Sequence, residues 1–439
     1  MHRIAELAAL IQQRTAEIDA YLQENNLPQP SFEEDASSNH NLTNKEIVDA
    51  RDDLLSATLE LHDLILGPAM CLRPMLNGVS LQAVYKYNIP EAVPIHGEIS
   101  FSELAKRTGL REYDVRRILR HAMVFHHVFQ EPREGFVAHT AASRRLRDDP
   151  DTMAGLGYFH DELWPSFAHT LPALEKSQGE EPNETGWSQY HGVDKPFYEH
   201  YVSHPAMAKR FRGAMAALAD ADGTAPEPLA DAYPWGSIGG AGDGTGTVVD
   251  VGGGKGHISV MLATRFPSLH FVVQDTPSMI AGAAAETLAG LPADVSDRIK
   301  FTSHDFFTDQ PAEADVYLLR NIIHNWSDAY AVRIMRALIP ALRTGSRIVI
   351  HDRVLPPPGT MHRMKERAIR EMDLWMLTLC NSREREEADW IALFAMADPR
   401  FVDARVKMWT PAGAAMSIIE IVWPGDGIVA RDLDEVSSI

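Results

Sequence analysis

Apolar residues recur every three or four positions in the first quarter of the chain, a spacing that predicts helices. One such stretch covers residues 4–22, a second covers residues 44–66 and a third covers residues 81–87. A polar, proline-containing segment at about residues 28–44 separates the first two. The apolar face of the first helix fits two roles, covering a core or forming a dimer contact, and the pattern does not choose between them.

Residues 100 to about 150 have the pattern of a winged helix. A helix is predicted over residues 101–108 and a second over residues 112–127, with Gly109 as the turn between them, and residues 128–140 suggest a short hairpin. Winged helices can bind DNA, and four arginines lie on or beside the second helix: Arg111, Arg116, Arg117 and Arg120. Neighbouring acidic residues dilute this charge, so we expect a structural or dimerising module and no nucleic acid partner.

The second half of the chain alternates between strand-like and helix-like patterns. Residues 223–246 are rich in Gly, Ala and Pro and are predicted to form a loop. After it, predicted strands and helices alternate at residues 247–251, 257–265, 269–274, 279–288, 315–319, 330–342 and 347–350. Such alternation predicts a mostly parallel sheet covered by helices. Two final strands, at residues 403–409 and 416–423, predict an antiparallel pair that closes the sheet.

A glycine-rich turn follows the first strand of this region. The run is Val248-Val249-Asp250-Val251-Gly252-Gly253-Gly254-Lys255-Gly256. Lys255 is not followed by Ser or Thr, so the turn is not a Walker A phosphate loop. Gly256 comes one position too early for the G-x-G-x-x-G pattern of dinucleotide sites. The observed D-x-G-x-G-x-G resembles motif I of class I methyltransferases, and because Asp275 ends the next strand, we expect cofactor binding at this turn.

A second group of reactive side chains follows the strand at residues 315–319. The run is Leu318-Leu319-Arg320-Asn321-Ile322-Ile323-His324-Asn325-Trp326-Ser327-Asp328. His324 should therefore lie at the carboxyl edge of the sheet, where ligands bind in open α/β folds. Methylation of an alcohol or a phenol requires removal of a proton from a group with a pKa near ~10 or higher, and a histidine that titrates near neutrality suits that task. A lone histidine after a strand is more often structural, so the neighbouring motifs decide its role.

Three segments together resemble the plant caffeic-acid-type and fungal secondary-metabolite O-methyltransferases, namely residues 318–328, 350–358 and 372–390. The resemblance spans nearly the whole chain. It implies transfer of a methyl group from S-adenosyl-L-methionine to a hydroxyl of a small aromatic secondary metabolite. It also implies an α/β fold, a Rossmann-like seven-stranded methyltransferase sheet with an α-helical, winged-helix-like dimerisation domain before it.

The resemblance also implies how the chain divides. The parts are a helical and winged-helix-like dimerisation domain at residues 1–150, a helical connector that contributes to the substrate pocket at residues 151–222, the loop at residues 223–246, and the cofactor-binding domain at residues 247–425.

The family's general base is the histidine of an LHDWSD-like motif, which falls on His324. Two acidic residues flank it in the family and match Asp352 and Glu384, where they would orient the imidazole and stabilise its protonated form. The sequence departs from the family pattern twice, because Asn325 stands where an aspartate is common and Asp352 is shorter than the usual plant glutamate.

The resemblance further implies contacts with the cofactor and with the acceptor. The cofactor contacts fall on Asp250, Gly252, Gly254, Asp275, Asp305, Phe306 and Arg320. The acceptor contacts fall on Met215, Met376, Trp164 and Phe211, because thioethers and aromatic rings pack well on an aromatic acceptor. Ordinary helix core is the competing interpretation for each of these four. No metal is expected, since no cluster of His, Cys and Asp has the spacing of metal ligands.

An alternative activity stays open. Some fungal proteins that resemble this family are pericyclases, in which the fold and cofactor are kept but the pocket promotes a ring-forming rearrangement without methyl transfer. The presence of His324, Asp352 and Glu384 together favours methyl transfer. His351 and Arg353 are the polar residues that a rearrangement would most simply reuse.

Composition limits the partners and the compartment. The 439 residues carry 61 acidic and 41 basic side chains, a formal net charge of −20, which disfavours nucleic acid and anionic membrane surfaces. The chain has two cysteines, too few for a disulfide framework. It lacks a signal-peptide pattern and a long apolar run, so we expect a cytoplasmic enzyme with a small-molecule acceptor. Homodimerisation is expected from the resemblance and from the apolar N-terminal helices.

Overall fold

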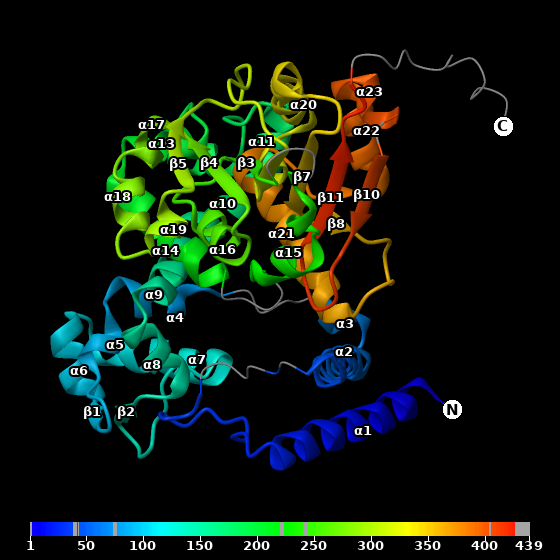
Figure 1. Ribbon diagram of the computed structural model, residues 1–439. Coiled ribbons are helices and arrows are strands. Elements are labelled where there is room, and N and C mark those ends of the chain that lie inside the picture. Colours follow the sequence, from blue (N-terminus) through cyan, green and yellow to red (C-terminus); the bar gives the residue numbers. More distant parts are fainter. Residues whose placement is uncertain are drawn as a thin grey trace. The chain divides into compact units, whose positions relative to one another are not determined.

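The computed structural model describes residues 2–37, 42, 44–72, 77–219, 224–239, 244–403 and 405–425 (Figure 1). The chain forms two compact units. Unit 1 comprises Met1–His169, Ser203–Asp220 and Pro358–Arg370, and unit 2 comprises Thr170–Val202, Ala221–Pro357 and Glu371–Ile439. Among the helices in the described ranges, none is both long and apolar enough to cross a bilayer.

Unit 2 is built on a seven-stranded sheet. In spatial order its strands are β10 (Arg405–Trp409), β11 (Ser417–Val422), β7 (Arg347–Asp352), β6 (Val316–Arg320), β3 (Gly246–Val251), β4 (Leu269–Asp275) and β5 (Ile299–Ser303). The five strands from β7 to β5 are parallel, whereas β11 runs antiparallel to both β7 and β10. The predicted α/β sheet and its closing antiparallel pair are confirmed. The strand order reverses at β3, so ligands are expected at the carboxyl ends of β3 and β6.

Helices cover both faces of this sheet, as Figure 1 shows. One face packs on α20 (Asp328–Leu338) and α22 (Glu387–Ala397), and the other on α15 (Glu227–Ala232) and α16 (His257–Arg265). Successive strand residues point to opposite faces, and both faces are apolar, which is why these strands read as continuous hydrophobic runs. The remaining elements of unit 2 are α11 (Thr170–Lys176), α12 (Gly186–His191), α13 (Phe197–Val202), η2 (Trp235–Ser237), α17 (Pro277–Ile280), α18 (Ala283–Leu288), α19 (Ala293–Ser296), η3 (Ile323–Asn325), η4 (Ile339–Ala341), β8 (Val354–Leu355), β9 (Arg385–Glu386) and α23 (Pro399–Asp403).

Unit 1 is helical. The long helix α1 (Arg3–Glu24) packs on α2 (Lys45–Leu66), which begins at the predicted residue because the Asn44 side chain accepts from two backbone N–H groups of the first turn. The other elements are α3 (Pro68–Cys71), α4 (Val79–Lys86), α5 (Ile89–Ala92), β1 (Glu98–Ser100), α6 (Phe101–Thr108), α7 (Glu112–His126), β2 (Phe136–Ala138), α8 (Ala141–Asp148), α9 (Pro150–Tyr158), the π-helix η1 (Phe159–Leu163), α10 (Trp164–Phe167) and α14 (Pro205–Ala219). Helix α21 (Arg363–Cys380) runs through residues of both units.

The predicted winged helix forms with one change of pairing. Helices α6 and α7 follow the predicted ranges, but β2 pairs mainly with β1, and the predicted hairpin is reduced to a single bridge between Gln130 and Ala138. The pairing with β1 buries Ile99 and Val137 in one core with the helices, which the local hairpin pattern did not reveal.

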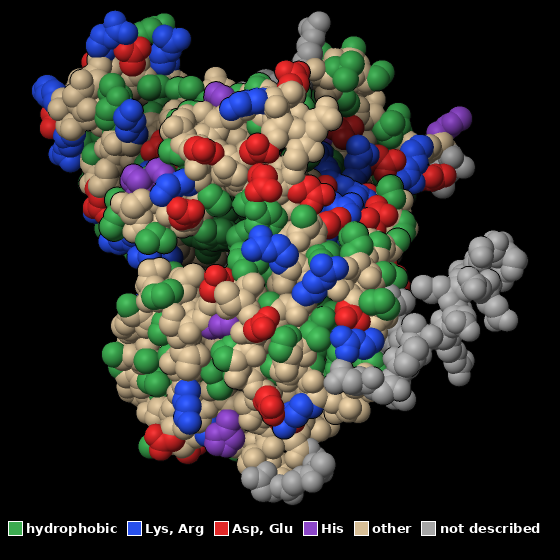
Figure 2. Space-filling model, turned by 90° about the horizontal axis from the view of Figure 1, so that it is seen from above, with side chains coloured by type: hydrophobic (Ala, Val, Ile, Leu, Met, Phe, Trp, Pro, Cys, Tyr) green, Lys and Arg blue, Asp and Glu red, His purple; other side chains and the backbone are tan. Residues whose placement is uncertain are grey.

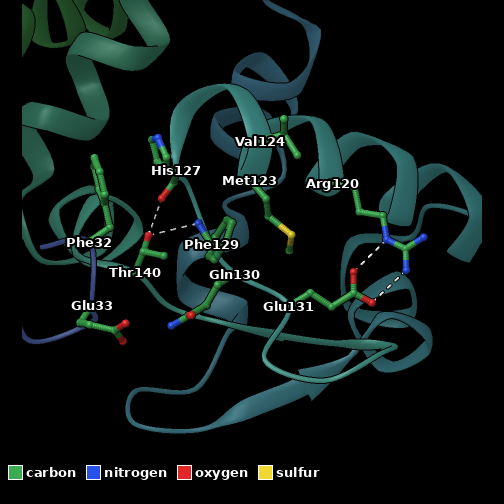
Figure 3. Close-up of a pocket in the computed structure, with 10 residues that line it drawn as sticks. All are labelled: Phe32, Glu33, Arg120, Met123, Val124, His127, Phe129, Gln130, Glu131 and Thr140. Atoms are coloured by element: carbon green, nitrogen blue, oxygen red, sulfur yellow. Dashed lines mark hydrogen bonds and ion pairs between the residues drawn. The ribbon is translucent and has the colours of Figure 1, made fainter.

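The arginines of this module are paired with nearby acids. Arg111 and Arg116 form ion pairs with acidic residues of α7. Arg120 donates to both oxygens of Glu131, as Figure 3 shows. Beside that pair, Phe32 stacks on His127 with ring centroids 4.0 Å apart, so the segment after α1 packs on the module. Figure 2 likewise shows acidic and basic side chains interspersed on one face of the molecule. Paired cations do not make the uncompensated basic surface that a phosphate backbone requires.

Three further predictions of elements were wrong in detail. Residues 223–246 are not all loop, because the segment contains α15 and the fully buried Trp235. The helix predicted over residues 279–288 is broken at Gly282, whose φ of +81° is left-handed, into α17 and α18. Strand β5 was missed, because its alternating residues are largely exposed and give no apolar run.

Candidate active site

The glycine turn after β3 has the backbone that the sequence predicts. Gly252, Gly254 and Gly256 all have positive φ, at +71°, +58° and +76°. A Cβ at Gly256 would lie 2.9 Å from the Phe301 ring, whereas a Cβ at Gly254 would meet nothing closer than a methionine methyl at 4.0 Å. Gly256 is thus required by packing, and Gly254 borders open space in which a ligand can approach the backbone closely.

Asp275 lies beside this turn at the end of β4. Its Oδ2 accepts from the Gly254 N–H at 2.9 Å, and its Oδ1 accepts from the Thr276 N–H at 2.7 Å. Each carboxylate oxygen can accept another hydrogen bond, and the side chain is half-buried. A carboxylate fixed in this way can accept hydrogen bonds from the two hydroxyls of a ribose, and the predicted cofactor contact of Asp275 stays a prediction.

Asp250 lies beneath the turn. It is buried, its Oδ2 accepts from the Ser259 hydroxyl at 2.7 Å, and a Cβ at Gly253 would lie 2.5 Å from its carboxyl carbon. Burial raises the pKa of Asp250 to about 6. The structure thus gives Asp250 a role in supporting the turn, and its predicted contact with the cofactor stays a prediction.

The other predicted cofactor residues lie around the same edge of the sheet. The Phe306 ring approaches within 3.7 Å of the position of a Gly252 Cβ and packs edge-on against Trp326, and the exposed Asp305 caps the turn that carries Phe306. Arg320, at the end of β6, donates to His351 Nδ1 at 3.2 Å and to the Thr224 carbonyl at 2.9 Å. Burial lowers the pKa of Arg320, against the attraction of Asp250. Of these three residues, Phe306 approaches the glycine turn, whereas Arg320 contacts β7 and the Thr224 carbonyl.

His324 lies in the 3-10 turn η3, directly after β6. Its Nδ1 is 3.0 Å from Glu384 Oε1, and its backbone N–H donates to Asp352 Oδ2 at 3.2 Å. The side chain is 9% exposed and Glu384 is fully buried. Among the described residues none bonds to Nε2, so this nitrogen is the one available to take a proton.

The electrostatics of the site favour a charged imidazole. Burial lowers the pKa of His324, but the charge and hydrogen bond of Glu384, with a smaller contribution from Asp352, outweigh burial and raise it above its ordinary value. Burial also raises the pKa of Asp352 to about 6. A base whose protonated form is stabilised in this way is a stronger proton acceptor than a free imidazole.

The structure brings all three predicted catalytic residues together but gives the two acids different contacts. Glu384 reaches the imidazole, whereas Asp352 holds the backbone of the turn and leaves its Oδ1 without a hydrogen-bond partner in the described part of the chain. The family resemblance implies that both acids orient the imidazole ring, whereas the structure shows this contact for Glu384. The backbone contact fits the shorter aspartate at this position.

Sequence reasoning missed several residues of the site. Ser382 donates to the His324 carbonyl, and Arg385 donates to the carbonyls of Ile323 and Trp326. Arg353, which the sequence offers only for the ring-forming alternative, lies 3.8 Å from Glu384 Oε1. The signal for Arg385 was its place directly after Glu384, but nothing in the sequence showed which carbonyls it reaches.

The four predicted acceptor residues are divided between the two units. In unit 1, Phe211 packs edge-on against Tyr158, Trp164 lies beside His160, and Met215 is partly exposed on α14. In unit 2, Met376 is buried on α21. An acceptor pocket shared by these residues stays a prediction.

Fold and site together define a class. The mostly parallel seven-stranded sheet, the glycine turn after β3 and the acid at the end of the next strand are those of a class I S-adenosylmethionine-dependent methyltransferase. The model of the O-methyltransferase domain family matches residues 174–398, and the chain belongs to this family.

Similar proteins of known name are also O-methyltransferases. The chain is 46% identical to the O-methyltransferase pyvH of Aspergillus violaceofuscus, over 96% of this chain and 99% of that protein. It is 45% identical to the grayanic acid biosynthesis cluster O-methyltransferase of Cladonia grayi, over 99% of this chain and 92% of the relative. The solved structure of OxaC is 21% identical and covers 95% of this chain and 100% of its own, with a TM-score of 0.72, a likeness of fold. The chain is therefore an O-methyltransferase of secondary metabolism, and S-adenosylmethionine is the cofactor of its family.

Proposed function

We propose that this enzyme transfers a methyl group from S-adenosylmethionine to a hydroxyl of a small aromatic secondary metabolite, with His324 as the general base. The observation that carries the proposal is the buried pair of His324 Nδ1 and Glu384 Oε1, 3.0 Å apart, at the sheet edge that also holds the glycine turn. A carboxylate only accepts hydrogen bonds, so Glu384 favours the tautomer with the proton on Nδ1 and the lone pair on Nε2.

The residues of the chain account for each proton in the reaction. His324 Nε2 takes the hydroxyl proton, and Glu384 stabilises the imidazolium that results. When bound, the cofactor supplies a sulfonium methyl group, so that the O–CH₃ bond forms as the S–CH₃ bond breaks and S-adenosylhomocysteine leaves. The glycine turn and Asp275 fit the nucleoside half of such a cofactor, because Gly254 leaves open space and Asp275 keeps lone pairs for a ribose. Alignment of the two reactants supplies much of the rate.

The names of relatives support a phenolic acceptor. One relative is the chlorophenol O-methyltransferase of Trichoderma longibrachiatum, 35% identical over 96% of this chain and 90% of that protein. A phenol is also the hydroxyl that a single histidine deprotonates most readily, since aliphatic alcohols are far weaker acids.

The proposal is tested by incubating the purified protein with methyl-labelled S-adenosylmethionine and a panel of chlorophenols, phenolic polyketides and alkaloids. Label in a methyl ether of one acceptor is the expected result. Binding of the cofactor with a rearranged, unlabelled product would overturn it in favour of the ring-forming alternative.

Replacing Asp275 with alanine should weaken cofactor binding. A hydrogen bond to a charged group contributes about 1.5–3 kcal/mol, so we expect the Kd for S-adenosylhomocysteine to rise about 10- to 100-fold. The measurement is isothermal titration calorimetry. Asp309→Ala removes an exposed carboxylate of the same unit and should leave the Kd unchanged. Equal affinity of the wild type and Asp275→Ala would show that the nucleoside binds elsewhere.

A further inference from the structure

The short segment between α21 and α22 holds the turn that carries His324. Among residues 382–385 of this segment, three contact that turn through their side chains. The Ser382 hydroxyl donates to the His324 carbonyl, Glu384 meets the imidazole, and Arg385 donates to backbone carbonyls on either side of the histidine. Glu384 and Arg385 are adjacent in the chain, so the placement of one constrains the placement of the other.

Arg385 makes the most extensive of these contacts. Its Nη1 lies 3.2 Å from the Ile323 carbonyl, its Nη2 lies 2.8 Å from the Trp326 carbonyl, and its Nε lies 2.9 Å from Asp328 Oδ1. The side chain is fully buried, and its guanidinium lies 5.4 Å from the centre of the Trp390 ring. A buried charge is costly unless it is paired and hydrogen-bonded, and these contacts satisfy Arg385 on all three nitrogens.

The carbonyls that Arg385 binds are significant because of their position. Ile323 begins η3 and Trp326 directly follows it, so the two carbonyls bracket His324. The Ile323 carbonyl also accepts from the Trp326 N–H, which closes this single 3-10 turn, and Arg385 binds the carbonyl at each end of it. The planar guanidinium spans both carbonyls and fixes their separation, which a lysine ammonium cannot do with one nitrogen. Asp328, the first residue of α20, holds the guanidinium from the other side.

We propose that Arg385 is a positioning residue for the reaction, which fixes the backbone on both sides of His324 so that the imidazole meets Glu384. This inference rests on the proposed role of His324 as the base. Arg385 touches neither reactant, and its effect passes through the geometry of the His324–Glu384 pair. A misplacement of about 1 Å at a reacting group can lower a rate by about 100-fold.

The test compares Arg385→Lys with Arg383→Gln as the matched control. Arg383 pairs with the same Asp328 at 2.6 Å, but it is 46% exposed and donates to neither carbonyl. With the most active acceptor of the panel, Arg385→Lys should lower kcat about 10- to 100-fold and leave the Kd for S-adenosylhomocysteine within about 3-fold of wild type. Arg383→Gln should keep kcat within about 3-fold.

A second readout needs no acceptor. The His324 ring can be titrated by NMR in histidine-labelled protein, with its signal assigned from the spectrum of His324→Ala. Because Glu384 raises the pKa of His324, a displaced imidazole in Arg385→Lys should titrate at a lower pH than in the wild type, whereas Arg383→Gln should not shift it. This readout separates the two proposals, since positioning is still reported if the wild type transfers no methyl group.

Two outcomes would overturn the inference. One is a folded Arg385→Lys with wild-type kcat and an unshifted His324 titration; the other is a loss of thermal stability alone, matched by Arg383→Gln. If Arg385→Lys does not fold, Asp328→Asn weakens the same contact from its other end, and an unshifted His324 titration in that variant counts against the inference equally.

Discussion

His324→Ala is expected to lower kcat for methyl transfer by about 100- to 10,000-fold, the usual contribution of a general base. The physical reason is the loss of Nε2, the nitrogen left free when Glu384 occupies Nδ1. The KM for S-adenosylmethionine should change little, because the glycine turn follows β3 and Asp275 ends β4, whereas His324 follows β6. The measurement is steady-state kinetics with labelled cofactor.

Two controls make this result specific to the base. His270→Ala removes an exposed histidine of β4 in the same sheet and should leave kcat unchanged. Added imidazole should restore part of the activity of His324→Ala, since it can enter the space of the missing ring and accept the proton. Activity of His324→Ala within about 3-fold of wild type would mean that another group takes the proton.

The parts of the site that could be predicted from the sequence are those formed by residues close together in the chain. The glycine turn of residues 250–256 needs left-handed backbone at fixed spacing, and this requirement is visible in the glycines themselves. His324 was placed by the same local logic, because the residue after a buried strand must emerge at the carboxyl edge of the sheet. The structure has both the left-handed glycine turn and His324 directly after β6, whereas the chemical roles of these residues stay predictions.

Contacts between segments far apart in the chain could not be predicted from such local patterns. Arg385 meets carbonyls about sixty residues earlier, and the partner of β2 is a strand on the other side of two helices in sequence. Such pairings depend on which apolar faces are buried together, and many sequences with the same pattern would pair differently. Asp352 shows this limit within the site, since its position was predicted and its contact with the backbone was not.

Glu384→Gln is expected to lower kcat by about 100- to 10,000-fold and to move the acid limb of the pH profile to lower pH. The base works only when neutral, so wild-type kcat/KM should fall as the pH drops through the raised pKa of His324. The glutamine removes the charge that raises this pKa, so the variant should hold its lower plateau to a more acidic pH. The amide can also donate to Nδ1, which favours the tautomer with the proton on Nε2 and removes the lone pair that accepts the substrate proton.

Asp352→Asn is the control that shows whether the shift of the acid limb is specific to Glu384 or follows the loss of any nearby carboxylate. Asp352 accepts from the backbone N–H of His324 and raises the pKa of the imidazole less than Glu384 does. Asp352→Asn should therefore shift the acid limb less than Glu384→Gln. Asp352 itself has a pKa of about 6, and removing it also takes a second titrating group out of the same pH window. The profiles are best measured as kcat/KM between about pH 5 and 9, where His324 changes charge. An unmoved acid limb in Glu384→Gln, with the limb of Asp352→Asn displaced, would assign the coupling to Asp352 and leave Glu384 as packing.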